Sequence, residues 1–100
     1  MEPTASANVL VVIGSAREES NLRQLAHIAG AAAAAAGAEV RTLDLHDTRL
    51  PVMVWGDPDQ AALAEVRAVR DSAAWADAFI LGTPEYHGSM SGALKNWFDF

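Results

Sequence analysis

Residues 9–14 read Val9-Leu10-Val11-Val12-Ile13-Gly14, a continuous apolar run, rich in β-branched side chains, that ends in a glycine. A run of this kind is typical of a strand that is buried on both faces of a parallel sheet. From Asn21 onward, apolar residues recur near helical spacing until Gly37 supplies a C-terminal stop. We therefore expect the chain to open with a buried strand followed by a helix.

Further elements alternate in the same way along the chain. Residues 39–43 alternate polar and apolar side chains and predict a second, shorter strand nearer a sheet edge. Residues 44–59 contain Pro51, Gly56 and Pro58, which predict a long loop with a turn or a short strand inside it. A loop of this length in a small domain is usually functional.

The second half of the chain predicts a helix, a strand and the start of a third helix. Asp59 can cap a helix that runs to about Trp75, with acids early and arginines late, as the helix dipole favours. Residues 78–83 predict another buried strand. A last helical pattern opens at Ser91 or Gly92.

Strands that alternate with helices predict an α/β fold, in which a parallel sheet has right-handed crossovers and helices on both faces. We expect a flavodoxin-like three-layer sandwich with the strand order 2-1-3-4-5, of which this chain contains only strands one to three. Residues 1–8 are predicted to be a disordered tail. Residues 9–100 are predicted to be the N-terminal part of a single domain, truncated in its third helix. Without a fourth strand, the third strand should form a bare apolar edge that favours aggregation.

The composition argues against several classes of partner. Seven Lys and Arg against thirteen Asp and Glu give a formal net charge of −6, which would repel nucleic acid. The chain has no cysteine, and therefore no disulfide, thiol nucleophile or thiolate metal site. The N-terminus has no basic region, and the apolar run that follows it, Val9 to Ile13, is too short for a signal peptide or a membrane span. We expect a cytoplasmic protein with no nucleic-acid or membrane partner.

The loop after the first strand predicts a phosphate site. In an open parallel sheet, ligands bind at the carboxyl ends of the strands, here between strands one and three. Residues 14–21 lead into a helix N-terminus, where free N–H groups and the helix dipole favour an anion. The hydroxyls of Ser15 and Ser20 and the guanidinium of Arg17 would add donors to the same phosphate.

Each of these residues also has a simpler explanation. Ser20 can be only an N-cap, Gly14 only a turn residue and Arg17 only a solvated charge. We favour a phosphate site because all three lie at the end of one buried strand. No Gly-Lys-Ser or Gly-Lys-Thr is present, and the second and third glycines of the dinucleotide fingerprint are missing. Asp44, after the second strand, is therefore interpreted as a surface loop residue rather than as a ribose ligand.

The loop after the third strand, residues 83–92, is rich in Gly and Ser and carries one aromatic ring, that of Tyr86. Its backbone can approach a flat ligand closely while Tyr86 offers a ring face. His87 could donate a proton near neutral pH, but no acid or nucleophile is placed to pair with it, so we assign it no chemical role. We predict no catalytic residue. We also predict no metal site, because His27 and His46 lack metal-ligand spacing.

Together the two loops resemble the signatures of the NADPH-dependent FMN reductase family, which includes quinone, chromate and azo reductases. The first signature is carried by Gly14-Ser15-Ala16-Arg17 with Ser20-Asn21-Leu22. The second and more specific one is carried by Pro84-Glu85-Tyr86-His87-Gly88-Ser89 with Gly92-Ala93-Leu94-Lys95-Asn96-Trp97-Phe98-Asp99. The resemblance runs from the first strand to the end of the chain but covers only the front part of the family's domain.

The resemblance implies FMN as the cofactor and NADPH or NADH as the hydride donor. The FMN phosphate would be held by Ser15, Arg17, Ser20, Asn21 and Leu22. The ribityl chain and the isoalloxazine would be lined by Pro84, Glu85, Tyr86, His87, Gly88 and Ser89. The chain departs from the family at His87, where many members carry Asn, and at Ser91, where many carry Pro. Both departures keep a polar or small loop residue, so FMN binding is still expected while the electron acceptor is left open.

The implied reaction passes a hydride from the nicotinamide to flavin N5. The flavin then reduces a small-molecule acceptor, which can be a quinone, an azo compound, a metal oxyanion or free flavin. The cofactor carries this chemistry while the protein positions the rings, which explains why no acid–base pair is visible. The family also implies a homodimer or tetramer with the flavin near a subunit interface.

Two other interpretations stay open. An electron-carrier flavodoxin would share the fold, although its phosphate loop is typically rich in Thr, Ser and Gly and lacks an arginine like Arg17. The chain could also be an inactive fragment of a reductase, whose incomplete sheet does not retain flavin. A phospho-receiver domain is excluded, because it needs an acidic pair after the first strand and an acceptor Asp after the third.

Overall fold

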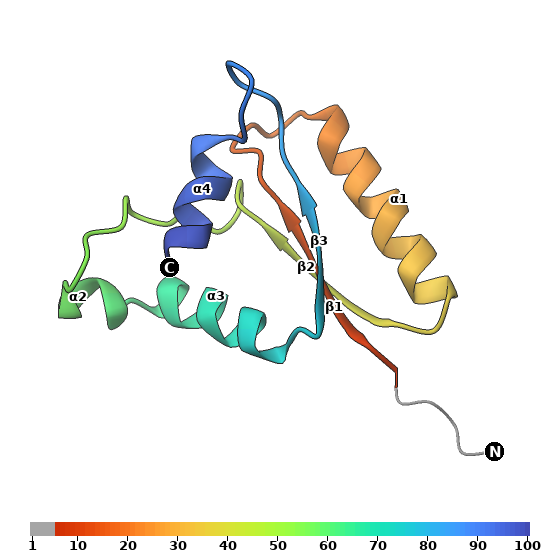
Figure 1. The fold of residues 1–100 in the computed structure, drawn as a ribbon, viewed down its shortest axis with the longest axis horizontal. Helices are drawn as coiled ribbons and strands as arrows, with labels where there is room; N and C mark the ends of the chain where they lie inside the picture. The colour runs from red at the N-terminus through yellow and green to blue at the C-terminus, as the bar shows by residue number, and fades with distance from the viewer. Residues whose placement is uncertain (1–5) are drawn as a thin grey trace.

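The computed structural model describes residues 6–100, which contain a parallel sheet with the strand order β2-β1-β3 (Figure 1). Its strands are β1 (Asn8–Ile13), β2 (Glu39–Asp44) and β3 (Ala78–Gly82). Its helices are α1 (Asn21–Ala35), α2 (Pro58–Ala61), α3 (Ala64–Trp75) and α4 (Gly92–Asp99). This order confirms the predicted flavodoxin-like α/β fold, in which the first strand is central. No helix within residues 6–100 is long and apolar enough to cross a membrane.

β1 is the centre of the sheet and of the core. Residues 9–13 are at most 8% exposed, because β2 and β3 pair with its two edges and helices cover its two faces. Successive side chains of a strand point to opposite faces. Leu10 and Val12 pack with residues of α3 and α4, whereas Val11 and Ile13 pack against Ala26 of α1. The result is three layers, with α1 on one face of the sheet and α3 and α4 on the other (Figure 1).

β3 differs from the prediction of a buried strand. It pairs only with β1, so its second edge is open within the described residues. Phe79 and Leu81 are accordingly 43% and 42% exposed. The apolar residues 78–82 do form a strand, but the burial of a strand depends on a second neighbour that periodicity does not reveal. β3 is instead the exposed apolar edge that we expected of a three-stranded sheet.

The predicted helix from Asp59 to Trp75 is in fact two helices, α2 and α3. Asp57 rather than Asp59 caps α2, since its carboxylate accepts a hydrogen bond of 2.9 Å from the Asp59 N–H. Pro58 then occupies the first turn, where a backbone N–H is not needed. Leu63 leaves helical geometry (φ −64°, ψ 138°) before α3 begins. The Asp-Pro pair thus starts a helix earlier than the apolar periodicity indicates.

β1 begins at Asn8, one residue earlier than predicted. The Asn8 N–H donates a hydrogen bond of 2.8 Å to the Asp77 carboxylate, and the Asp77 N–H donates one of 2.7 Å to the Asn8 carbonyl. The Asn8 side-chain amide also donates to the Trp75 carbonyl at 3.1 Å. These bonds join the start of β1 to the chain that leads into β3. Of the predicted disordered tail, residues 1–5 lie outside the described residues.

Candidate cofactor-binding site

The carboxyl ends of β1 and β3 come together at Gly14. Its N–H donates a hydrogen bond of 2.8 Å to the Gly82 carbonyl. A Cβ atom at position 14 would lie 2.6 Å from that carbonyl oxygen and 2.9 Å from Leu94 Cβ, so only glycine fits here without displacing backbone. Gly14 is therefore more than a turn residue, because it lets the end of β1 approach both β3 and α4.

Ser91 ties the loop after β1 to the loop after β3. It is 2% exposed, and its hydroxyl donates a hydrogen bond of 2.6 Å to the Gly14 carbonyl. The same Oγ accepts a bond of 3.1 Å from the Leu94 N–H, which makes Ser91 the N-cap of α4. The Ser91 N–H donates to Thr83 Oγ1 at 2.9 Å, so both ends of the loop after β3 are held together. Sequence analysis identified Ser91 as a helix start and as a departure from the family pattern, but not as a link to Gly14, since an N-cap serine carries no sign of a long-range partner.

A cleft of about 430 Å³ opens beside the first of these loops. It is lined by Arg17, Glu19, Ser20, Asn21, Leu22 and Pro84. The structure therefore brings together every residue predicted for the phosphate except Ser15, along with the first residue predicted for the flavin rings. Among the described residues, the Arg17 guanidinium has no carboxylate partner. It is free to meet an anion.

The backbone of residues 15–20, which we call the anion loop, is oriented for a negatively charged ligand. Five of its N–H groups donate to no protein acceptor within the described part of the chain: Ser15, Ala16, Glu18, Glu19 and Ser20. Three of its carbonyl groups, in contrast, accept hydrogen bonds from arginine side chains: Ser15, Ala16 and Glu18. Unpaired N–H groups beside the N-terminus of α1 favour an anion.

The two predicted serine donors lie in different surroundings. Ser15 is 2% exposed, and its Oγ accepts a bond of 3.3 Å from the Arg17 N–H, so it shapes the loop instead of lining the cleft. Ser20 lines the cleft and also caps α1, since its Oγ accepts a bond of 3.2 Å from the Leu22 N–H. The N-cap interpretation of Ser20 is confirmed. Its hydroxyl proton can still be donated to a ligand, because the cap uses only the oxygen.

The tip of the loop after β3 forms an exposed turn. Tyr86 and Ser89 exchange two backbone hydrogen bonds, of 3.0 and 3.1 Å. The two residues between them both have positive φ, 52° at His87 and 78° at Gly88. Two successive positive φ angles are the geometry of a tight hairpin turn. Figure 1 shows this turn projecting beyond the end of the sheet.

Pro84 and Glu85 connect this turn to the rest of the loop. Pro84 lines the cleft, whereas Glu85 does not. The Glu85 carboxylate instead accepts a hydrogen bond of 2.7 Å from the Gly88 N–H and so closes the turn. Of the residues predicted to line the ribityl chain and the rings, the structure thus brings only Pro84 to the residues predicted for the phosphate.

An ion pair that sequence analysis missed lies behind the anion loop. Arg23 donates through Nε and Nη2 to the two carboxylate oxygens of Asp44, at 2.5 and 2.9 Å. The interpretation of Asp44 as a surface loop residue is wrong, because it is the last residue of β2 and its side chain is 16% exposed. The hydrogen bond from Arg23 lowers the pKa of Asp44, against the opposing effect of burial. The same bond raises the pKa of Arg23.

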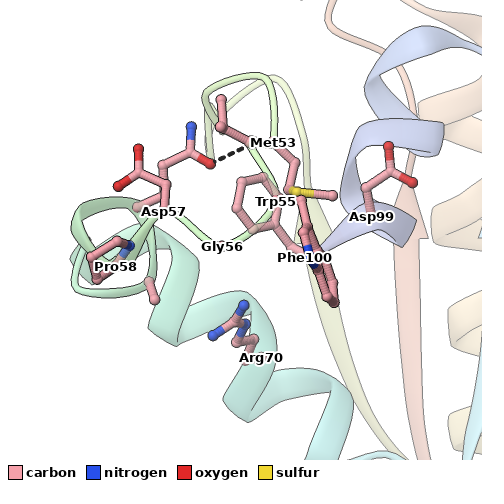
Figure 2. Close-up of a pocket in the computed structure, with 11 residues that line it drawn as sticks. Met53, Trp55, Gly56, Asp57, Pro58, Arg70, Asp99 and Phe100 are labelled. Carbon is pink, nitrogen blue, oxygen red and sulfur yellow. Dashed lines mark hydrogen bonds between the residues drawn. The ribbon is translucent and has the colours of Figure 1, made fainter.

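A second cleft, of about 320 Å³, contains none of the predicted site residues (Figure 2). It lies between the loop of residues 53–57, α2, α3 and the end of α4. Trp55 lines it and is 90% exposed. Two of its charged residues are already engaged, since Asp57 caps α2 and Asp99 pairs with a lysine one turn earlier. Arg70 is the third. We assign no chemistry to this cleft.

Comparison with known proteins gives matches over nearly the whole chain. The family model of the NADPH-dependent FMN reductases matches residues 7–100. A 2-hydroxy-1,4-benzoquinone reductase from Burkholderia sp. is 36% identical, over 92% of this chain and 48% of that protein. An FMN-dependent NADPH-azoreductase from Staphylococcus aureus (strain USA300) is 32% identical, over 90% of this chain and 50% of that protein.

A solved structure has the same fold. The crystal structure of Smu.1420 from Streptococcus mutans UA159 matches with a TM-score of 0.70 at 22% identity, over 92% of this chain and 51% of that chain. This chain spans about half the length of the curated relatives that it matches. The match to the family model nevertheless covers all but the first six residues, including both loops that carry the resemblance. The chain therefore belongs to the NADPH-dependent FMN reductase family.

Proposed function

We propose that this chain forms the FMN-phosphate side of a reductase that passes a hydride from NADPH or NADH through FMN to a small acceptor. The observation that carries the proposal is the anion loop at the end of β1. Arg17 and Ser20 line one cleft there, and several N–H groups of the loop have no acceptor among the described residues. Membership of the family supports FMN as the cofactor and NADPH as the hydride donor.

The donors at this cleft fit a phosphate monoester. A phosphate dianion is stabilised by several hydrogen-bond donors and by positive charge, and it is favoured at a helix N-terminus. The anion loop supplies a guanidinium, a hydroxyl and unpaired N–H groups at the start of α1. Glu19 also lines the cleft, so Arg17 carries the only positive side-chain charge in the lining. The attraction for a phosphate would therefore depend strongly on Arg17.

We place the flavin rings along the loop after β3. This assignment uses Pro84, Glu85, Tyr86, His87, Gly88 and Ser89. Pro84 lines the phosphate cleft, so the loop begins where a bound phosphate would end. The Tyr86 ring is half-exposed and can stack on a flat ligand. FMN supplies the redox chemistry when it is bound, while these residues would hold the rings and orient them.

For the electron acceptor we propose a quinone or an azo compound. The names of the relatives, a benzoquinone reductase and an azoreductase, support this choice. A metal oxyanion or free flavin would receive electrons by the same route. We further propose that the whole protein works in the cytoplasm as a homodimer or tetramer.

The proposal is tested by purifying the full chain with added FMN and measuring its visible absorbance before and after adding NADPH without oxygen. We expect a flavin spectrum that survives gel filtration, is bleached by NADPH and returns when a quinone is added. A retained flavin that NADPH does not bleach would favour an electron-carrier flavodoxin. A chain that retains no flavin at saturating FMN would refute the proposal for this chain and favour the inactive fragment.

A further inference from the structure

The anion loop is held from behind by two arginines that do not line its cleft. Arg23, on the first turn of α1, donates through Nη1 to the Glu18 carbonyl at 2.6 Å and through Nη2 to the Ser15 carbonyl at 3.4 Å. Arg49, in the loop after β2, donates through Nη2 to the Ala16 carbonyl at 3.0 Å. These carbonyl oxygens are therefore turned toward positively charged side chains.

Each of these arginines is itself fixed in place. Arg23 makes the bidentate pair with Asp44, and its side chain is only 17% exposed. Asp44 also accepts a hydrogen bond of 2.9 Å from the His46 N–H. Arg49 donates through Nε to the His46 carbonyl at 2.8 Å. Both guanidinium groups are thus anchored to the same short stretch at the end of β2, and a planar guanidinium with two anchors has a fixed direction.

A carbonyl that is held in one direction also sets the direction of the next N–H. The two groups belong to one planar trans peptide unit, in which they point to opposite sides. The Ser15 carbonyl shares its unit with the Ala16 N–H, and the Glu18 carbonyl shares its unit with the Glu19 N–H. Neither of these two N–H groups has an acceptor among the described residues. Arg23 therefore sets the direction of two donors that it does not touch.

We propose that Arg23 is a positioning residue for the FMN phosphate, an inference that rests on the proposed function. By holding two carbonyls of the anion loop, it points the N–H groups of Ala16 and Glu19 away from itself and toward the phosphate. Its own charge is neutralised by Asp44, so it contributes geometry. Arg17, in contrast, would contribute charge directly to the ligand.

The experiment compares FMN with riboflavin, which lacks the phosphate, by fluorescence titration of the full chain. Arg23→Met keeps an apolar side chain of similar length but removes the hydrogen bonds to the loop and to Asp44. We expect FMN to bind about tenfold more weakly, which corresponds to the loss of one well-placed hydrogen bond. Riboflavin affinity should stay within about twofold. Arg23→Lys should restore only part of the FMN affinity, because it keeps the charge without the planar fork.

Arg67→Met is the matched control. Arg67 is exposed on α3, so the substitution removes the same charge without touching the anion loop. We expect both flavins to bind this variant as they bind the wild type. If Arg67→Met weakens FMN binding as much as Arg23→Met does, the effect is one of net charge and the proposal is refuted.

Other outcomes separate this inference from the proposed function. Equal losses of FMN and riboflavin in Arg23→Met would mean a general structural role and would overturn the inference. A wild-type preference for FMN that survives in Arg23→Met would also overturn it, while leaving the phosphate site intact. A wild type that binds FMN no better than riboflavin would refute the phosphate site itself. If Arg23→Met does not fold, Asp44→Asn takes its place, because it weakens the anchor of Arg23 and keeps the shape of the Asp44 side chain. This variant must then lose FMN affinity, by less than about tenfold, without losing riboflavin affinity.

Discussion

Asn96 and Gln60 bind alternate backbone groups of one extended segment, residues 51–54. Asn96 of α4 accepts a hydrogen bond of 3.0 Å from the Met53 N–H and donates one of 2.8 Å to the Pro51 carbonyl. Gln60 of α2 accepts a bond of 2.7 Å from the Val54 N–H, drawn as a dashed line in Figure 2, and donates one of 2.8 Å to the Val52 carbonyl. Two amide side chains therefore do for this segment what a neighbouring strand does elsewhere.

Asn96→Ala should lower the free energy of unfolding by about 1–3 kcal/mol, because it leaves a half-buried N–H and carbonyl without partners. Gln60→Ala is the matched comparison and should cost less, since its bonds are exposed and water can replace them. Urea denaturation of both variants measures the difference. Equal losses of unfolding free energy in the two variants would mean that the burial of these bonds does not determine their contribution to stability.

Ser91→Ala should lower the free energy of unfolding by about 1–3 kcal/mol. The substitution removes the N-cap of α4 and leaves the Gly14 carbonyl without its donor. Ser72→Ala is the control, because the Ser72 hydroxyl only bonds back to a carbonyl of its own helix, which adds little stability. Thermal and urea denaturation should show that Ser91→Ala is much less stable than Ser72→Ala. Indistinguishable curves would contradict the role of Ser91 as the link between the two loops.

Arg17→Ala should weaken FMN binding by about 1.5–3 kcal/mol, the range for losing a hydrogen bond to a charged group. Glu19→Ala, in the same cleft, should change FMN affinity little. Both affinities can be measured by quenching of flavin fluorescence. If neither substitution changes the affinity, Arg17 is a solvated charge and the phosphate binds elsewhere.

His87 occupies a backbone position that favours another residue. Its φ of 52° lies in the left-handed region, which Asn tolerates better than most side chains and which β-branched residues resist. His87→Asn should therefore keep or raise the melting temperature, and His87→Val should lower stability by about 1–2 kcal/mol. Because we assign His87 to contact with the flavin rings and not to proton transfer, and because Asn is also polar, His87→Asn should also keep NADPH-driven reduction. A reductase that folds but loses its activity in His87→Asn would show that assignment to be wrong.

Asp44 should make stability depend on pH in the acid range. Its pKa in the folded chain is lowered, chiefly by the hydrogen bond from Arg23, so the stabilisation is present above the ordinary carboxylate pKa of about 4. It is lost as the pH falls through the lowered folded value. Asp44→Asn should therefore destabilise the chain at pH 7. The difference in stability between this variant and the wild type should become smaller as the pH drops. Denaturation midpoints from pH 7 to pH 2 measure this, and a constant difference would count against the ion pair.

The elements that sequence patterns predict well are those whose signal is local. The unbroken apolar run of β1 and the helical spacing after Asn21 gave both elements almost to the residue, because burial on two faces or on one stripe leaves a direct trace in the sequence. The anion loop was located for the same reason, since it follows β1 and precedes a capped helix. The strand order followed from the flavodoxin-like arrangement, in which crossovers are right-handed and helices cover both faces of the sheet.

The features that escaped prediction depend on partners far along the chain. Asp44 looks like an ordinary acid at the end of a strand, and only its contact with Arg23, 21 positions away, identifies it as part of the site's support. Ser91 likewise meets Gly14 only in the folded chain. The exposure of Phe79 depends on the number of strands beside β3, which no property of that residue encodes. The start of α2 was placed too late because Asp57 and Pro58 were assigned to a loop, and its separation from α3 at Leu63 was not predicted.

The central place of β1 also has a consequence for the order in which the molecule assembles. β1 pairs with β2 after a shorter connection, with Asn8 opposite Glu39, whereas its link to the chain before β3 joins Asn8 to Asp77, 69 positions apart. The extra entropy of closing the longer loop is modest, below about 1 kcal/mol, but it favours the nearer pairing first. The bond between Ser91 and Gly14 can form only after β3 has docked. A chain in which only β1, α1 and β2 have formed would hold the anion loop but lack the loop after β3, so we expect the cofactor to stabilise the chain chiefly after β3 has docked.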